Sequence, residues 1–434
     1  MTRTRAYAVV IAVCALPRIV LLVHERVGVT QNFEKSKLLA QMYVANGTFG
    51  YVPGHPTAYT QPLYGYFLIP IFWIAGFHWW SFGTAQILVA VATSICVLET
   101  GRRFLSLRIG VLGAVIATLQ PYLLWHDIHG NREILDQLIG AALFGLTLLA
   151  ASRRSVWTGV GLGVVAGLGV LSNARLTVLP LVLAGFILWR GAGWAVAVAV
   201  PLVAAVTVSP WVVRNKVELG CYAITTDGRA LWKANNVNTY KTLSSGLWLD
   251  QVPDLPQRLV RPIPPMWVTP ETAGAEWVQN HRVIDVPECA QQSAYEHLVF
   301  KFWEHHPGEK VKLAGQATQM LWSPRAGLEG AQEAGVDPLR RWGEPLYTVP
   351  LFLLAIAGLF CVPFTFRVLA IVFLLYETAA AWVFAGTTRY RVPWDFVLAL
   401  LAAAALDRAW TWFRGRKQAV GPVAGGVTGL DNAA

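Results

Sequence analysis

Ten long apolar stretches recur along the 434 residues, and they limit the chain to folds in which most of its length avoids water. The hydrocarbon core of a bilayer is about 30 Å thick, which about 20 helical residues span. Charged residues are 14% of the chain, against about 25% in a soluble domain. We therefore predict an α-helical polytopic membrane protein. The ten stretches lie near residues 6–23, 82–100, 109–126, 134–151, 156–173, 175–190, 194–212, 346–364, 367–386 and 392–410.

The charged residues are concentrated in one block. Residues 215–345 contain 13 Lys/Arg and 15 Asp/Glu, which predicts a single soluble domain of mixed α/β structure. The rest of the chain contains 22 Lys/Arg and 10 Asp/Glu, so the net charge of +10 belongs to the membrane part. A basic excess there is typical of cytoplasmic loops and argues against nucleic-acid binding.

The basic residues also predict the topology. If Arg3 and Arg5 are cytoplasmic, the other clusters at helix ends are cytoplasmic too, as the positive-inside rule requires. This holds only if the apolar stretch 63–77, which contains Pro70, lies at the outer interface without crossing. Both termini are then cytoplasmic, in a cytoplasmic (inner) membrane. These clusters are Arg102, Arg103, Arg108, Arg153, Arg154, Arg190, Arg367, Arg414, Arg416 and Lys417.

Four regions follow from this topology. The first helix lacks a small-x-small cleavage site, which indicates an uncleaved transmembrane helix. The predicted regions are a transmembrane module 1–214 with its first outer loop at 25–82, an extracytoplasmic domain 215–345, transmembrane helices 346–417 and a disordered cytoplasmic tail 418–434.

Cys221 and Cys289 are the two cysteines in the outer domain. On the extracytoplasmic side they could form a disulfide, and the sequence leaves this open against two free thiols.

Two acidic positions on the predicted outer side are candidates for chemistry. Glu34 lies in the first outer loop, and Glu133 lies where a helix re-enters the membrane, beside Arg132. A carboxylate beside an apolar interface can have a raised pKa and act as a general base. A solvated loop acid at 34 and an Arg132–carboxylate ion pair are the alternatives.

Outward basic residues at helix ends form a second group: Arg175, Arg214, Arg389 and Arg391. Guanidinium groups match phosphate geometry, so these residues favour an anionic lipid substrate, with lipid-headgroup anchoring as the alternative. Arg18 and Glu377 lie inside predicted helices, where an ionisable group needs a partner.

Metal binding has weak support. His55, His126 and His129 could join Glu34 or Asp127 around a divalent cation, but no fixed ligand spacing is present.

Several short segments occur in a fixed order along the chain: Glu34, 47–49 (GTF), 56–59 (PTAY), 62–64 (PLY), 120–122 (QPY) with Glu133 beyond it, 209–215 (SPWVVRN), 228–236 (GRALWKANN), 306–307 (HP) and 389–393 (RYRVP). No single segment is specific, but their order over residues 18–393 is. In this order the chain resembles the bacterial branch of the GT-C glycosyltransferases, the family 39 or protein-mannosyltransferase-like enzymes.

The resemblance implies a GT-C fold with a catalytic acid in the first outer loop and interfacial helices after it. The donor would be a polyprenyl-phosphate sugar, and the acceptor an envelope glycan, lipid or protein. No cofactor would be required, although a divalent cation could take part. The family often has Asp near position 34 and Pro where Gln61 stands, so either Glu34 or Glu133 could be the base.

We expect Glu34 to deprotonate the acceptor, with inversion at the anomeric carbon, and Glu133 to orient acceptor or sugar. We expect Arg214, Arg389 and Arg391 to hold the phosphate. Further substrate contacts are expected from Arg132, Tyr59 and Tyr64.

Two other classes share these features. A lipid-linked-sugar flippase also needs charges at membrane depth, but it predicts two related halves, and no duplication is visible. An O-antigen ligase-like enzyme would use a diphosphate donor. The sugar, the acceptor, the prenol length and the oligomeric state are not readable from the sequence.

Overall fold

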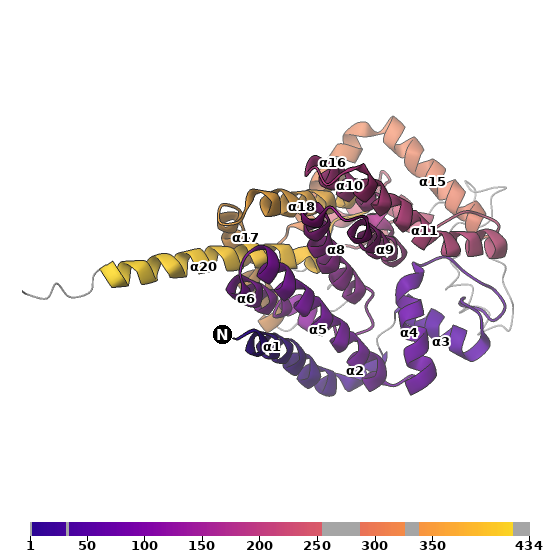
Figure 1. The fold of residues 1–434 in the computed structure, drawn as a ribbon. Helices are drawn as coiled ribbons and strands as arrows, with labels where there is room; N and C mark the ends of the chain where they lie inside the picture. The colour runs from indigo at the N-terminus through magenta and orange to yellow at the C-terminus, as the bar shows by residue number, and fades with distance from the viewer. Residues whose placement is uncertain (1, 32–33, 254–286, 326–337, 420–434) are drawn as a thin grey trace, which may run out of the picture.

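The computed structural model describes residues 2–31, 34–253, 287–325 and 338–419, and these are folded mainly into helices (Figure 1). Within the described residues no β-strand is present, and the single isolated bridge pairs Val52 with His55. The predicted α-helical polytopic class is therefore confirmed, and the predicted β content of the outer domain is wrong for its described part.

Seven helical segments of the described chain are long and apolar enough to cross a bilayer. Seven of the ten predicted spans therefore form helices of this length in the described residues. The seven are α1 (Arg3–His24), α5 (Trp79–Phe104), α8 (Glu133–Arg153), α11 (Trp194–Leu219), Trp342–Leu359 of α17 (Pro338–Leu359), α18 (Phe364–Val383) and Thr388–Arg414, which comprises α19 (Thr388–Arg391), η5 (Val392–Trp394) and most of α20 (Asp395–Ala419).

The other three predicted spans form shorter helices. The predicted span 109–126 is divided, because α6 (Leu107–Thr118) ends before Pro121 and the chain restarts as α7 (Pro121–His126). The 12 residues of α6 are about 18 Å long. The remaining two are α9 (Val156–Ser172) and the pair η1 (Ala174–Leu176) and α10 (Leu179–Trp189).

The apolar stretch 63–77 forms α4 (Pro62–Ala75), which has only 14 residues. At 1.5 Å per residue it is about 21 Å long, short of the hydrocarbon thickness. Trp73 and Ile74 at its end are largely exposed. The length of α4 agrees with the prediction that this stretch does not cross.

Glycines determine how closely α9 approaches α11. A Cβ atom added at Gly159, Gly163 or Gly167 would lie 2.6–2.8 Å from a backbone carbonyl oxygen of α11. Small residues at four-residue intervals allow two membrane helices to pack backbone against backbone. This pair fixes one side of the bundle.

The centre of the bundle is apolar and lies around α8. The ring of Phe144 packs against Phe366 of α18 and Phe396 of α20, with centroids 5.1 and 5.9 Å away. Edge-to-face arrangements of this kind are favourable beyond simple burial. The C-terminal helices are thereby held against the N-terminal ones.

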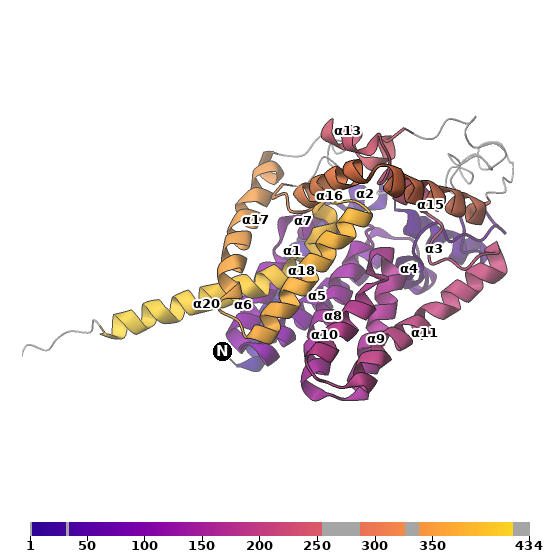
Figure 2. The same cartoon turned by 90° about the horizontal axis from the view of Figure 1, so that it is seen from above.

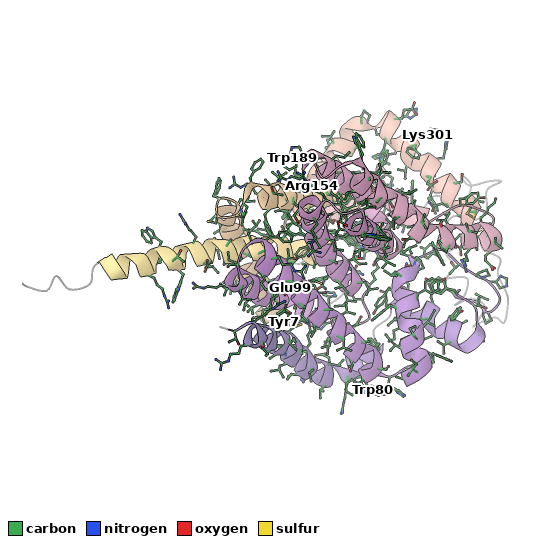
Figure 3. All side chains as sticks on the ribbon, viewed as in Figure 1. Tyr7, Trp80, Glu99, Arg154, Trp189 and Lys301 are labelled. Carbon is green, nitrogen blue, oxygen red and sulfur yellow. A yellow bond between two sulfur atoms is a disulfide. The ribbon has the colours of Figure 1, made fainter. Side chains whose placement is uncertain are left out.

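At the C-terminal end of α5, where the basic residues lie, Glu99 contacts several side chains and lies close to Tyr7 of α1 (Figure 3). It accepts hydrogen bonds from Arg102 at 2.6 Å and from Arg103 at 2.9 Å, and the Tyr7 hydroxyl of α1 also donates to it. This cluster fixes α1 to α5.

Helices α12 (Gly228–Lys233), α13 (Thr239–Ser244), α15 (Glu288–His305) and α16 (Pro307–Leu321) make up most of the described part of block 215–345, with the short η2 (Leu249–Gln251). Of these, α13, α15 and α16 lie along the side of the bundle away from the N-terminus (Figure 2). These helices contact the bundle directly. For example, the Trp382 indole of α18 donates to the hydroxyl of Thr318 in α16 at 2.8 Å. The described part is a helical cap and not a separate soluble domain.

The buried Arg18 of α1 pairs with Asp127, which follows α7, with Nη2 2.7 Å from Oδ2. Gln137 of α8 donates to the other carboxylate oxygen of Asp127 at 2.8 Å. This network satisfies the intramembrane arginine and joins three helices. The predicted need of Arg18 for a partner is met.

Candidate active site

A cavity of about 320 Å³ lies between the bundle and the helical cap. Its walls come from the loop before α3 (Lys35–Asn46), the loop before α4, the start of α8, η1, α12, η2, the loop before α19 and α19 itself. The lining residues are Glu34, Lys35, Thr60, Gln61, Arg132, Asn173, Ala174, Arg175, Thr225, Asp227, Ala230, Leu231, Leu249, Asp250, Phe384, Ala385, Arg389 and Tyr390. Four cationic and three acidic side chains thus share one space.

Glu34 is the N-cap of α3, and its Oε1 accepts a hydrogen bond from the backbone N–H of Ser36 at 3.4 Å. Within the described part of the chain this carboxylate forms no ion pair. Burial raises the pKa of Glu34 above its ordinary value; Arg389 opposes the increase and Glu133 adds to it. A carboxylate with a raised pKa is suited to accept a proton.

Glu133, the first residue of α8, is buried, and its carboxylate is paired with arginine side chains. Arg389 donates to it twice, from Nε to Oε1 at 2.6 Å and from Nη2 to Oε2 at 3.1 Å. The Nε atom of Arg132 is 3.8 Å from the same Oε1. A carboxylate held by two guanidinium groups is stabilised in its charged form and is a poor proton acceptor. The geometry therefore favours Glu34 over Glu133 as the proton acceptor.

Arg132 and Arg175 complete the cationic wall of the cavity. Arg132 donates to the side-chain oxygen of Gln61. Arg175 is 3.3 Å from Glu377 and lies over the ring of Tyr390, with 3.7 Å between its Cζ and the centroid. Buried Glu377 thus has its partner, which the sequence left open.

Four predicted substrate residues do not line the cavity. Arg391 is buried and donates to Asp395 at 3.1 Å and to the carbonyl of Ser323 at 2.7 Å. Arg214 donates to the carbonyl of Thr57 at 2.9 Å.

The two tyrosines are similarly engaged. Tyr64 donates to Gln86 at 2.5 Å and accepts from the Asn131 N–H at 3.0 Å. Tyr59 is buried beneath Lys35, whose Nζ is 5.0 Å from the ring centroid. The polar groups of Arg391, Arg214 and Tyr64 thus form hydrogen bonds within the fold, and the phosphate role expected of Arg214 and Arg391 stays a prediction that these contacts do not support.

The structure adds lining residues that the sequence analysis did not select. Asp227 is the N-cap of α12 and accepts from the Ala230 N–H at 3.1 Å. Burial raises its pKa, while Lys35 opposes the increase. Asp227 lies in the GRALWKANN neighbourhood, but an N-cap aspartate is too common to signal a site.

A metal ligand set is not apparent. Across residues 2–31, 34–253, 287–325 and 338–419, no group of three His, Cys, Asp or Glu side chains is placed to hold an ion. Dependence on a divalent cation therefore stays a prediction.

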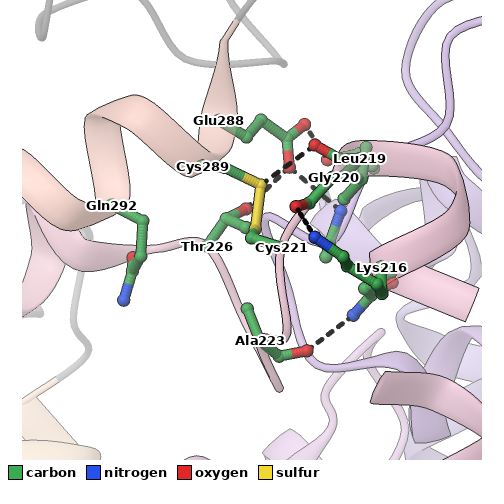
Figure 4. Close-up of a disulfide and its surroundings, with 12 residues drawn as sticks. Lys216, Leu219, Gly220, Cys221, Ala223, Thr226, Glu288, Cys289 and Gln292 are labelled. Carbon is green, nitrogen blue, oxygen red and sulfur yellow. Dashed lines mark hydrogen bonds between the residues drawn. A yellow bond between two sulfur atoms is a disulfide. The ribbon is translucent and has the colours of Figure 1, made fainter. Parts of the chain in front are cut away.

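Cys221 and Cys289 form a disulfide, with 6.0 Å between their Cα atoms (Figure 4). It joins the end of α11 to the start of α15. Of the two alternatives left open by the sequence, the structure has the bonded one.

Comparisons with known proteins identify the fold. Residues 55–213 match the family described as dolichyl-phosphate-mannose-protein mannosyltransferase. No curated protein matches the chain. Over these residues the match confirms the resemblance found in the sequence.

Among solved structures, the chain is similar to the archaeal oligosaccharyltransferase AglB from Archaeoglobus fulgidus in complex with an inhibitory peptide and a dolichol-phosphate. The TM-score is 0.51 at 14% identity, covering 96% of this chain and 52% of that one. An apo oligosaccharyltransferase from the same organism gives 0.52 at 16% identity, with the same coverage of each chain.

ArnT from Cupriavidus metallidurans bound to undecaprenyl phosphate gives a TM-score of 0.39 at 14% identity, covering 92% of this chain and 80% of that one. The chain spans about half the length of the two archaeal proteins, and the likeness to them is one of fold.

Proposed function

We propose that this chain, whose residues 55–213 match the dolichyl-phosphate-mannose-protein mannosyltransferase family, transfers a sugar from a polyprenyl-phosphate-linked donor to an acceptor hydroxyl. The observation that carries the proposal is one cavity lined by Glu34 and by three arginines, Arg132, Arg175 and Arg389. It combines a proton acceptor with a site for an anionic leaving group.

The three arginines suit the donor phosphate. As the anomeric C–O bond breaks, negative charge develops on the departing phosphate monoester, and fixed guanidinium donors stabilise it without a nucleotide. Arg175 is fixed by Glu377 and Arg389 by Glu133, so neither needs to reorganise during the reaction. Arg132, Arg175 and Arg389 therefore replace Arg214 and Arg391 in the phosphate role.

Glu34 is suited to act as the general base for the acceptor hydroxyl. It removes the proton of the acceptor hydroxyl as that oxygen forms a bond to the anomeric carbon from the face opposite the phosphate. The anomeric carbon is inverted, and polyprenyl phosphate leaves with the electron pair of the broken bond. The raised pKa of Glu34 brings this base closer to neutral pH.

Glu133 has a different role in this scheme. Its two hydrogen bonds from Arg389 assign it to orienting that guanidinium towards the cavity. It is a positioning residue, and its predicted contact with sugar or acceptor is not needed.

The reaction is assigned to the outer face of the cytoplasmic membrane. A disulfide beside the cavity suits an oxidising compartment. The basic clusters of the loops then remain in the cytoplasm, as the positive-inside rule requires.

AglB is described in complex with a dolichol-phosphate and an inhibitory peptide. It has the same fold, which supports a lipid-phosphate donor here. An envelope glycan, a lipid or a protein is the proposed acceptor. No cofactor is needed for the transfer, and activity with and without a chelator tests the divalent cation.

The experiment is to measure release of polyprenyl phosphate by the purified protein in lipid, with a panel of polyprenyl-phosphate sugars and total envelope acceptors. Turnover of one monophosphate donor is expected. Turnover of diphosphate donors alone would favour a ligase-like enzyme. Movement of donor across the bilayer without any transfer would replace the proposal with a flippase.

A further inference from the structure

Glu288 lies outside the cavity, yet its carboxylate joins the two segments that form one of the cavity walls. We call Thr60, Gln61, Thr225 and Asp227 the loop wall; all four line the cavity. Glu288, the first residue of α15, is buried and accepts hydrogen bonds from residues of both segments. We infer, on the basis of the proposed function, that Glu288 is a positioning residue that sets the substrate affinity of the cavity.

The first segment is 57–61. Glu288 accepts from the Thr57 hydroxyl and, at 3.0 Å, from the backbone N–H of Ala58. The chain reaches Thr60 and Gln61 of the loop wall only two and three residues later. Since Gln61 accepts from Arg132, the placement of this segment extends to a cationic residue of the cavity.

The second segment is 225–227. The hydroxyl of Thr226 donates to Glu288 at 2.6 Å, between Thr225 and Asp227 of the loop wall. The two segments also contact each other, because the Thr226 N–H donates to the Ala58 carbonyl at 2.9 Å. Glu288 thus accepts hydrogen bonds from both partners of this pairing, and it is not among the residues that line the cavity.

The disulfide fixes where this carboxylate can be. Cys289 follows Glu288 directly and is bonded to Cys221, five residues before Thr226 (Figure 4). A covalent link one residue away holds the start of α15 near residues 225–227. The buried carboxylate and the disulfide therefore act together on the loop wall.

Burial raises the pKa of Glu288, whereas its three hydrogen-bond donors and Arg214 oppose the increase. A buried carboxylate with three donors is costly to replace, since Ala would leave those donors without an acceptor. Gln keeps one carbonyl oxygen, which can accept from Ala58 and Thr226 together. The Gln variant should therefore preserve most of the arrangement.

The test compares Glu288→Ala, Glu288→Gln and the double variant Cys221→Ser/Cys289→Ser with the wild type in the polyprenyl-phosphate release assay. Glu296→Ala is the matched control, because it removes an acid of the same helix, two turns further on, that contacts Gln292. Glu288→Ala should raise the donor KM at least about tenfold with kcat within about threefold, because uniform binding is lost while the base stays in place. Glu288→Gln should stay within about threefold of the wild type, and the double variant should lie between.

Hydrogen–deuterium exchange separates this inference from the proposed function, because it requires no turnover. Peptides covering 57–61 and 222–228 should exchange at least about tenfold faster in Glu288→Ala than in the wild type or in Glu296→Ala. If the wild type lacks transferase activity but exchange responds, the arrangement stands and the proposed function fails. An unchanged KM in folded Glu288→Ala, or unchanged exchange in these peptides, would overturn the inference.

Discussion

Arg389 donates two hydrogen bonds to the carboxylate of Glu133, at 2.6 and 3.1 Å, and thereby connects the C-terminal helices to the start of α8. The pair makes the two candidate acids unequal. Glu133 is held in its charged form, whereas Glu34, which lines the cavity, accepts one backbone hydrogen bond. This difference is the reason to assign the proton transfer to Glu34.

The pH profile should report Glu34. A base must be deprotonated to act, and burial raises the pKa of Glu34 above its ordinary 4.5. The acid limb of kcat/KM should therefore have its midpoint above pH 4.5. The positive charge of Arg389 lowers the pKa of Glu34. Removing it also leaves the negative charge of Glu133 without its main partner, and that negative charge raises the pKa of Glu34. Arg389→Gln should move the midpoint to higher pH, and Arg389→Lys, which keeps the charge, should move it less; a shift to lower pH would exclude Glu34.

Arg132 should contribute to donor affinity. It lines the cavity beside Gln61, and a charge-assisted hydrogen bond is worth about 1.5–3 kcal/mol. Arg132→Gln should raise the donor KM or lower kcat/KM by about tenfold or more. Arg26→Gln, an exposed arginine in α2 (Arg26–Gln31), is the control and should match the wild type. Equal kinetics for both variants would remove Arg132 from the site.

Arg391 should affect stability more than substrate binding. Its side chain and that of Asp395 are both nearly fully buried, 3.1 Å apart. Removing one partner of a buried pair typically costs about 3–5 kcal/mol. Arg391→Met should lower the thermal unfolding temperature strongly, and Arg391→Met/Asp395→Leu should recover part of the loss. A stable Arg391→Met variant with a raised donor KM would restore the phosphate role expected from the sequence.

The contact between α9 and α11 gives a matched pair of glycine variants. A Cβ at Gly163 would lie 2.8 Å from the Val200 carbonyl oxygen, whereas at Gly161 nothing lies within 4 Å. Gly163→Ala should destabilise the protein by about 1–3 kcal/mol, as overpacking does. Gly161→Ala should be neutral or slightly stabilising. Equal unfolding temperatures for the two variants would contradict the close approach of these helices.

Hydropathy and charge in the sequence were sufficient for the class and for the short length of α4. They failed at 109–126, where Pro121 divides an apolar run that reads as one span. They also failed for 215–345, because surface charge does not distinguish a separate domain from helices packed on a bundle. Contacts such as Trp382 to Thr318 decide this, and they depend on tertiary structure.

The candidate site was predictable in part. Glu34, Arg132 and Arg389 were selected because charged side chains near a membrane boundary usually face a cavity or a partner, and all three line the cavity. Arg214 and Arg391 follow the same rule but are bonded to backbone carbonyls and to Asp395. Which arginine faces the cavity depends on partners distant in the chain, such as Glu133 for Arg389, and no local pattern reveals them.

The most direct test of the central claim is the rate of polyprenyl phosphate release by Glu34→Gln beside the wild type, under saturating donor and acceptor. Glu25→Gln, an acid near the end of α1 whose contact in the described chain is with His24, is the matched control. We predict a loss of at least about a hundredfold in kcat for Glu34→Gln and none for Glu25→Gln. Full activity of Glu34→Gln would contradict the account and transfer the role of base to Asp227 or Glu133.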